Sequence, residues 1–298
     1  MWSAAGRPKF TAMDETPFET HLPDQALSGV VFSSPHSGRQ YPADFVAASR
    51  LGRHALRASE DVLVDALFAG APAAGAPLIA ARLPRAWLDL NRAPTELDPA
   101  LVEGVSAQGL NQRVAAGLGV VPRVVAEGAA IYNGKITLAE AQARIAGFHV
   151  PYHTALEELL ASARAQHGRA LLFDCHSMPA DALRAAPRVR GRSPDIVLGD
   201  RFGAAAGRSV VAATQAAFER AGFLVGRNTP FAGGYITQRY GRPARGVEAV
   251  QIEINRALYL DARSLEPLPG FEALRARIDR VVRDLVAAGP SLGTVAAE

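Results

Sequence analysis

The chain has 298 residues, of which 49% are apolar, and this is enough to bury one large α/β core or two ordinary ones. Its 32 basic and 29 acidic residues leave a net charge of +3, and the arginines are scattered among acids, which argues against nucleic-acid binding. A single cysteine excludes an internal disulfide, and no apolar stretch is long enough to span a bilayer or to resemble a signal peptide. We expect a cytoplasmic protein, and its oligomeric state cannot be read from the sequence.

Short apolar runs alternate with helical patterns along the chain. The predicted strands are 29–32, 76–80, 86–90, 170–173, 195–200, 223–225 and 250–254. The predicted helices are 58–69, 137–166 with a break at Pro151, 202–221 and 265–287. This alternation favours an α/β fold of three layers, α/β/α, with a central mixed and mostly parallel sheet.

One domain is expected over residues 1–298, with 1–15 as a flexible N-terminal extension. No internal repeat or low-complexity linker divides the chain. Residues 92–134 and 226–246 are expected to form long functional loops, because they are rich in turn-forming residues and lack a clear periodic pattern.

Reactive side chains lie at or just after the ends of several predicted strands. They are His36, Asn91, Arg92, His176 and Glu253. Ligands of open α/β sheets bind beyond the carboxyl ends of the strands. Provided that these strands run in the same direction, the side chains form one catalytic centre.

Two histidines and one carboxylate are the ligand set of a catalytic zinc ion that keeps a fourth position for water. His36 lies in a Ser-Pro-His-Ser-Gly loop and His176 follows a buried strand; either histidine alone would more often be a capping or core residue. The carboxylate could come from Glu60 or Asp61, although Ser59 followed by acids is also an ordinary helix N-terminus. The same ligands also suit iron, cobalt or manganese.

Other nucleophile and metal candidates are weaker. Cys175 cannot easily pair with the adjacent His176, because neighbouring residues of a strand point to opposite faces, so Cys175 is expected in the core. Ser177 lacks the Gly-x-Ser-x-Gly elbow. His149 and His153 are four residues apart, but a proline lies between them and no glutamate follows the first, which favours packing or hydrogen bonding.

The arginines near residues 86–90 indicate anion binding. An arginine at the end of a buried strand is usually paired, either with an internal carboxylate such as Asp89 or with a substrate carboxylate. Arg92 beside Asn91 suits the second task. The glycine-rich segment 228–235 is typical of a mobile loop in which Tyr235 would supply a donor, or of an ordinary glycine turn.

Seven segments in this order resemble the N-formylglutamate amidohydrolase (N-formylglutamate deformylase) family. They are SPHSGRQYP, SEDVLVDALF, RAWLDLNR, LLFDCHSMP, DIVLGDRFG, NTPFAGGYITQRYG and VQIEINRALYLD, and they cover most of residues 16–262. The DLNR segment is also similar to the Asn-Arg motif of succinylglutamate desuccinylase, aspartoacylase and, more remotely, zinc carboxypeptidases. These relatives share a phosphorylase/hydrolase-like α/β/α fold.

The resemblance implies a single amidohydrolase domain that hydrolyses N-formyl-L-glutamate to formate and L-glutamate, a reaction of histidine degradation. It implies one divalent metal ion, with zinc expected, on His36, Asp61 and His176, and Glu253 as the general base. The expected substrate-binding residues, with Tyr235 added from the glycine-rich segment, are Arg85, Asn91, Arg92 and Tyr235. Where the family commonly has a histidine, this chain has Glu248.

Three alternatives stay open at this point. The same machinery could act on another N-acyl amino acid. The chain could be a non-catalytic relative that keeps a carboxylate-binding arginine, or a cysteine or serine hydrolase without metal. The expected partner in the first two cases is a small N-acyl amino acid with carboxylates, with no nucleic acid and no membrane.

Overall fold

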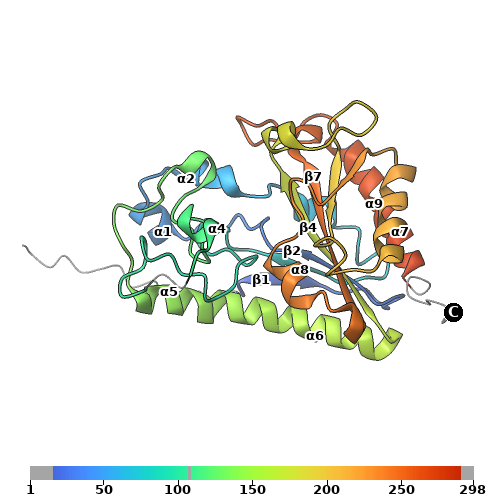
Figure 1. The fold of residues 1–298 in the computed structure, drawn as a ribbon, viewed down its shortest axis with the longest axis horizontal. Helices are drawn as coiled ribbons and strands as arrows, with labels where there is room; N and C mark the ends of the chain where they lie inside the picture. The colour runs from blue at the N-terminus through green and yellow to red at the C-terminus, as the bar shows by residue number, and fades with distance from the viewer. Residues whose placement is uncertain (1–15, 107–108, 290–298) are drawn as a thin grey trace, which may run out of the picture.

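The computed structural model describes residues 16–106 and 109–289, and the expected extension at 1–15 lies outside them. One seven-stranded sheet runs through this part of the chain, in the order β1-β3-β2-β4-β7-β5-β6. Strands β1, β2, β4 and β7 are labelled in Figure 1. The strands are β1 Phe18–His21, β2 Val30–Ser34, β3 Leu78–Ala81, β4 Ala170–Met178, β5 Ile196–Gly199, β6 Val225–Arg227 and β7 Val247–Asn255. Strands β3, β2, β4 and β7 are parallel, whereas β1 and the β5–β6 pair run antiparallel to them. The predicted mixed, mostly parallel sheet is confirmed.

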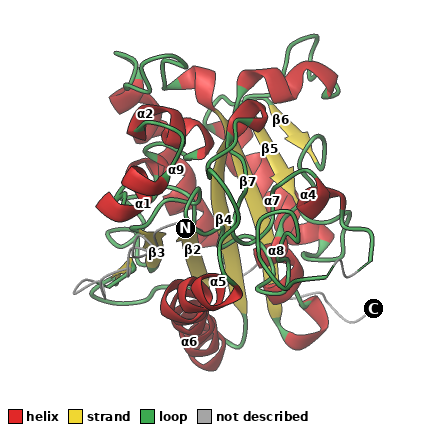
Figure 2. Ribbon diagram, turned by 90° about the vertical axis from the view of Figure 1, so that its left-hand side faces the viewer, coloured by secondary structure: helices red, strands yellow, loops and turns green. Residues whose placement is uncertain are grey.

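Helices cover both faces of the sheet, which gives the predicted three layers (Figure 2). They are α1 Ala43–Ala48, α2 Arg53–Leu56, α3 Val64–Leu67, α4 Gln112–Ala115, α5 Leu138–Arg144, α6 Val150–His167, α7 Arg208–Arg220, α8 Tyr235–Tyr240 and α9 Phe271–Ala288. Helices α3, α7 and α9 pack on one face, and α5, α6 and α8 on the other. None of the helices in the described residues is both long and apolar enough to cross a membrane.

Strand β4 is longer than the apolar run predicts. Leu171, Phe173 and Cys175 point into the core under α3, α7 and α9, while Leu172 packs on the opposite side. Because side chains alternate along a strand, the next two residues on the side of Leu172 are Asp174 and His176. The prediction that the strand ends at Phe173 is wrong, since polar residues continue its pairing with β7 as far as Met178.

The helix predicted over 137–166 has no break at Pro151. Its two α-helical parts, α5 and α6, are joined by a π-helical turn at Ile145–His149, and the chain continues as one helical rod. Pro151 lies in the first turn of α6, directly after the π-helical turn, and does not interrupt the rod. A π turn inserts one extra residue, and such turns often occur at functional sites.

Residues 86–90 do not form the predicted strand. The N–H groups of Trp87 and Leu88 both donate to the carbonyl of Pro84, at 3.0 and 3.3 Å, so the segment turns back. The N–H of Asp89 then donates to the carbonyl of Val120, at 2.8 Å. The segment is therefore anchored by a loop of the same region and not by the sheet.

Helix lengths also differ from the predictions. Only Val64–Leu67 of the predicted 58–69 helix is α-helical, because Leu63 adopts a left-handed conformation with φ of 59° and separates it from a 3₁₀ turn at Arg57–Ser59. Helices α7 and α9 begin later than predicted, at Arg208 and Phe271. The predicted loop at 226–246 contains α8 and part of β6, whereas 92–134 is largely irregular, as predicted.

Candidate active site

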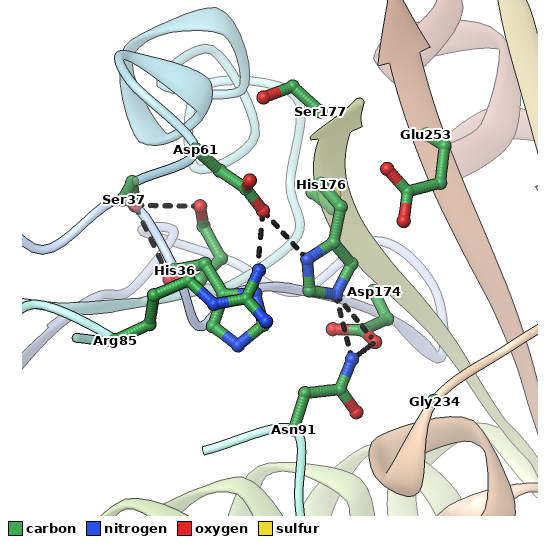
Figure 3. A network of polar contacts seen from close by, with 12 residues as sticks. His36, Ser37, Asp61, Arg85, Asn91, Asp174, His176, Ser177, Gly234 and Glu253 are labelled. Carbon is green, nitrogen blue, oxygen red and sulfur yellow. Dashed lines mark hydrogen bonds and ion pairs between the residues drawn. The ribbon is translucent and has the colours of Figure 1, made fainter. Parts of the chain in front are cut away.

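A cavity of about 610 Å³ opens at the carboxyl ends of β2, β4 and β7. Almost all the predicted site residues line it, from strands and loops far apart in the sequence: His36, Asp61, Arg85, Asn91, Arg92, His176 and Glu253. The assumption that these strands are parallel is correct, and Figure 3 shows the side chains of His36, Asp61 and His176 turned toward one another. Tyr235 is not among the lining residues.

Tyr235 lies in α8, on the side of His149 and His153. Its ring centroid is 5.9 Å from that of His149 and 5.5 Å from that of His153. Its hydroxyl accepts a hydrogen bond from Nη1 of Arg239, at 2.7 Å. The structure therefore places Tyr235 with His149, His153 and Arg239, and not among the residues that line the cavity.

Two histidines and an aspartate form a buried cluster that could bind a metal ion. Oδ2 of Asp61 lies 2.9 Å from Nδ1 of His176 and 3.5 Å from Nδ1 of His36. All three residues are at most 3% exposed. Nδ1 of His36 is buried and has no hydrogen-bond partner, which is costly for a polar atom unless something else satisfies it. The donor set and this unsatisfied nitrogen fit a divalent cation.

A carboxylate lies behind each histidine. Nε2 of His36 is 2.7 Å from Oδ1 of Asp89, and Nε2 of His176 is 2.9 Å from Oδ2 of Asp174. Both rings are thereby oriented with Nδ1 toward Asp61. Hydrogen bonds of this kind orient imidazole ligands and increase their basicity in protein metal sites.

The charges of the cluster depend on one another. Burial would raise the pKa of Asp61, but the hydrogen bond from His176, the nearby imidazole of His36 and the charge of Arg256 hold it well below its usual range. Burial would lower the pKa of His176, but the charges and hydrogen bonds of Asp174 and Asp61 raise it well above its usual range. A metal ion binds neutral imidazole, so its binding would displace a proton from this site.

The cluster contains Asp61 and not the neighbouring Glu60. The N–H of Asp61 donates to the carbonyl of His36, at 2.9 Å, which fixes the two residues side by side. Glu60 turns away and accepts hydrogen bonds from Arg57 and Tyr41, both at 3.1 Å. Its carboxylate is therefore hydrogen-bonded to these two residues, outside the histidine–aspartate cluster.

Glu253 lies directly opposite His176 in the parallel pairing of β4 with β7. Nε2 of Gln251 donates to Oε1 of Glu253, and Oε1 of Gln251 accepts from the N–H of Gly234, both at 2.7 Å. Burial raises the pKa of Glu253 to about 7. A carboxylate with a pKa near neutrality is suited to exchange protons as a general base and acid.

The side-chain amide of Asn91 forms hydrogen bonds to other groups of the protein. Its Oδ1 accepts from the N–H of Ile236 at 2.8 Å, and its Nδ2 donates to Oδ2 of Asp174 at 3.3 Å. A Cβ atom at Gly234 would lie only 2.4 Å from the Asn91 side chain, so this close approach requires glycine. Asn91 therefore connects the metal cluster with the beginning of α8.

His149 and His153 also fix the segment that carries Asn91. Nε2 of His149 lies 2.9 Å from the carbonyl oxygen of Arg92, and Nε2 of His153 lies 2.9 Å from that of Leu90. The expectation that these histidines form hydrogen bonds is confirmed. Burial lowers the pKa of His153 to about 3, so its imidazole is neutral at physiological pH.

The arginines of the cavity differ in their partners. Nη2 of Arg85 contacts Oδ2 of Asp89, at 2.7 Å, so Asp89 is the internal partner of Arg85 and not of Arg92. Nη2 of Arg256 contacts Oδ1 of Asp61, also at 2.7 Å. Arg92 is 8% exposed and its hydrogen bonds go to the backbone carbonyls of Leu118 and Asn91, with no carboxylate partner in the described residues. A buried guanidinium of this kind is suited to bind an anion.

Neither of the alternative nucleophiles contacts a basic side chain that could activate it in the described residues. Cys175 is fully buried in the core, as predicted, and burial raises the pKa of its thiol well above the usual range. The Oγ of Ser177 accepts a hydrogen bond from Nε of Arg256, at 3.0 Å. Glu248 lies at the other end of β7, where it pairs with Arg169 at 2.5 Å, so its difference from the family pattern does not affect the cavity.

Sequence reasoning assigned no role at the site to Asp174, Gln251 or Arg256. Strand alternation could have identified Asp174 and Gln251. Each lies two residues before a predicted site residue, on β4 or β7, and therefore faces the same side of the sheet. No local pattern identifies Arg256, because its partner Asp61 is 195 residues away in the chain.

A buried histidine–aspartate cluster beside a carboxylate, at the strand ends of an open α/β sheet, is typical of metal-dependent hydrolases. Residues 28–260 match the family model described as N-formylglutamate amidohydrolase. The chain is 31% identical over 267 residues to an N-formylglutamate deformylase of Pseudomonas aeruginosa, covering 87% of this chain and 93% of that protein. It is 29% identical over 263 residues to the enzyme of the same name from Pseudomonas putida, covering 87% and 91%.

The fold agrees with that of a solved relative. The crystal structure of N-formylglutamate amidohydrolase from Ralstonia eutropha superimposes with a TM-score of 0.86 at 33% identity, covering 93% of this chain and 99% of that one. A gene product of Agrobacterium tumefaciens shares the fold, with a TM-score of 0.65 at 21% identity over 93% and 96% of the two chains. The chain belongs to the N-formylglutamate amidohydrolase family, and it is a hydrolase that acts on an amide bond.

The raised pKa of Glu253 predicts how the stability of the protein depends on pH. Folding favours the protonated carboxyl, so the contribution of Glu253 to stability falls as the pH rises from its unfolded pKa near 4.5 toward 7. Glu253→Gln is neutral throughout. In protein freed of metal by chelation, we expect the variant to gain stability relative to the wild type between pH 5 and pH 8, by at most about 3 kcal/mol.

Urea unfolding at several pH values measures this difference. Glu158→Gln, an exposed position on α6, is the matched control and should show no such trend. A difference between Glu253→Gln and the wild type that stays constant from pH 5 to pH 8 would contradict the assignment of a raised pKa.

Proposed function

We propose that the protein hydrolyses N-formyl-L-glutamate to formate and L-glutamate with the help of one divalent metal ion, for which zinc is the expected choice. The observation that carries this proposal is the cluster of His36, Asp61 and His176 directly beside the buried Glu253. The same cavity also contains Arg92, which has no carboxylate partner in the part of the chain that the structure describes. The names of the Pseudomonas and Ralstonia relatives support the choice of substrate.

The metal ion would be held by Nδ1 of His36, Nδ1 of His176 and the carboxylate of Asp61. When bound, it would supply a Lewis acid that lowers the pKa of water to near neutrality. Asp89 and Asp174 would hold the two imidazole rings in place from behind. Arg256 would fix the second oxygen of Asp61.

Glu253 would move the protons of the reaction. Gln251 occupies Oε1, which leaves Oε2 to accept a proton from the attacking water. The water oxygen forms a bond to the formyl carbon, the C–N bond breaks, and Glu253 returns the proton to the leaving amine nitrogen. Arg85 contacts Asp89 through Nη2, and its other guanidinium nitrogens would stabilise negative charge on the formyl oxygen.

The predicted substrate-binding residues would contribute in different ways. Arg92 would bind a substrate carboxylate directly, because within residues 16–106 and 109–289 its guanidinium bonds to backbone carbonyls alone. Asn91 would act by positioning, since its amide is bonded to Ile236 and Asp174. Tyr235 would have to leave Arg239 to reach a substrate, and its role stays a prediction.

Another N-acyl amino acid is the second candidate substrate, because the cavity volume does not by itself restrict the acyl group to formyl. The third candidate, a metal-free hydrolase, has little support from the buried Cys175 and from Ser177, which is bonded to Arg256. We also propose that the chain acts as a single amidohydrolase domain in the cytoplasm. A small-molecule substrate is its expected partner.

Formate release from N-formyl-L-glutamate is the direct test of this proposal. We expect activity that disappears after chelation and returns when zinc is added, because the histidine–aspartate cluster supplies the only candidate metal site in the described residues. Formate can be quantified with a coupled formate dehydrogenase assay. Activity that persists in metal-free protein would rule out the metal mechanism, and metal-bound protein without activity on this substrate would exclude the substrate.

His176→Ala tests the ligand assignment. We expect the variant to lose bound metal and activity together while it stays folded, because it removes one of three ligands and leaves the apolar residues of β4 unchanged. Metal content is measured by elemental analysis and folding by circular dichroism. His21→Ala, on the exposed strand β1, is the control and should retain both. A full equivalent of metal in His176→Ala would refute the assignment.

Glu253→Gln tests the role of the base. We expect metal content like that of the wild type and a loss of kcat of about 10²–10⁴-fold, the usual contribution of general acid–base catalysis. The wild type should lose kcat/KM as the pH falls below about 7, since the base must be unprotonated and its pKa lies near that value. Steady-state kinetics between pH 5 and pH 9 measure both effects. A variant with near-normal turnover would show that Glu253 is not the base.

A further inference from the structure

Four arginines line the cavity, and only two of them have a carboxylate partner in the described residues. Arg85 pairs with Asp89, and Arg256 with Asp61. The other two are Arg92 and Arg113. Arg92 was expected from the sequence, whereas Arg113 lies in the irregular segment 92–134 and no motif identifies it.

Arg113 and Arg92 are brought to the same wall of the cavity by Leu118. The N–H of Leu118 donates to the carbonyl of Arg113, at 2.8 Å. The carbonyl of Leu118 in turn accepts a hydrogen bond from Nε of Arg92, at 2.9 Å. Arg113 is exposed, in the short helix α4 at the cavity mouth, whereas Arg92 is 8% exposed and lies next to Asn91.

The short helix that carries Arg113 is fixed at its beginning. Oδ1 of Asn111 accepts from the N–H groups of Arg113 and Val114, at 3.0 and 3.2 Å, and Nδ2 of Asn111 donates to Glu96, at 3.2 Å. The backbone of Arg113 is therefore held by capping on one side and by Leu118 on the other. Arg113 lines the cavity, and its guanidinium has no polar partner among the described residues.

The guanidinium groups of Arg92 and Arg113 repel each other, and neither has a carboxylate partner in the described residues. Burial lowers the pKa of Arg92, and the positive charges of Arg85 and Arg113 lower it further. Another arginine of the same segment, Arg123, does have a carboxylate partner, because its Nε donates to Oδ2 of Asp98, at 2.8 Å. The charges of Arg92 and Arg113, which no carboxylate in the described residues contacts, are offset most directly by a ligand with two negative charges.

We propose that Arg113 is a specificity-determining residue that binds the side-chain carboxylate of the substrate, while Arg92 binds the α-carboxylate. This inference rests on the proposed function, because N-formyl-L-glutamate carries both carboxylates. The α-carboxylate is close to the reacting amide and meets Arg92, the deeper arginine beside Asn91. The side-chain carboxylate lies several bonds further from the amide and meets Arg113 at the mouth. The enzyme therefore prefers N-formyl amino acids with an acidic side chain.

Arg113→Gln tests this assignment with two substrates of nearly the same shape, N-formyl-L-glutamate and N-formyl-L-glutamine, in which a side-chain carboxylate is replaced by a neutral amide. For N-formyl-L-glutamate we expect KM to rise about ten- to a hundredfold with little change in kcat, the usual cost of a lost charge-assisted hydrogen bond. For N-formyl-L-glutamine we expect kinetics like those of the wild type. The preference for N-formyl-L-glutamate over N-formyl-L-glutamine that we expect of the wild type should therefore be largely lost in Arg113→Gln.

Two further variants separate binding from structural effects. Arg113→Lys keeps the charge but not the planar fork, and we expect it to restore part of the preference. Arg280→Gln removes an exposed arginine from α9, outside the cavity, and should change neither substrate's kinetics. Metal content and circular dichroism should match the wild type in all three.

The outcomes distinguish the inference from the proposed function. A wild type that does not hydrolyse N-formyl-L-glutamate overturns the proposed function and this inference with it. An active wild type with an unchanged substrate preference in Arg113→Gln overturns the inference alone. An equal loss on both substrates also overturns it, because Arg113 would then act on a group that both substrates share.

Discussion

The site depends on the in-register parallel pairing of β4 with β7. This pairing sets His176 opposite Glu253 and Asp174 opposite Gln251, with all four side chains on the face away from α7 and α9. A slip of one residue would turn Glu253 into the core and bring Ile252 or Ile254 beside His176. The apolar residues that alternate with the polar ones fix the register, since Phe173 and its neighbours can be buried only when the polar residues face the cavity.

Charge pairing offsets the cost of burying the polar side chains that this register brings together. An isolated buried charge is costly, and a buried pair is tolerated when hydrogen bonds satisfy its remaining atoms. Asp89 meets both His36 and Arg85, and Asp174 meets both His176 and Asn91, so each carboxylate orients an imidazole while it binds a second donor. Glu253 has weaker compensation, and burial raises its pKa to about 7. The residue with the least compensation is therefore the one suited to exchange protons.

The sequence predicts the layers and most of the site because both follow from strand periodicity and from the rule that ligands bind at strand ends. It fails where a long-range contact decides the local structure. Residues 86–90 have the composition of a strand, but Pro84 turns the chain and Val120 accepts the N–H of Asp89. The selection of Asp61 over Glu60 depends on the distant His176, and Tyr235 faces His149 because α8 forms where a loop was predicted.

Residues 231–236, before and at the start of α8, are hydrogen-bonded to side chains that hold the site together. Gly234 donates to Gln251, which holds Glu253, and Ile236 donates to Asn91, which contacts Asp174. The same segment therefore touches the partner of the base and the partner of a metal-binding histidine. Any outward movement of residues 231–236 would break both hydrogen bonds and free the side chains that orient Glu253 and His176. The position of residues 231–236 is therefore coupled to the geometry of the cluster.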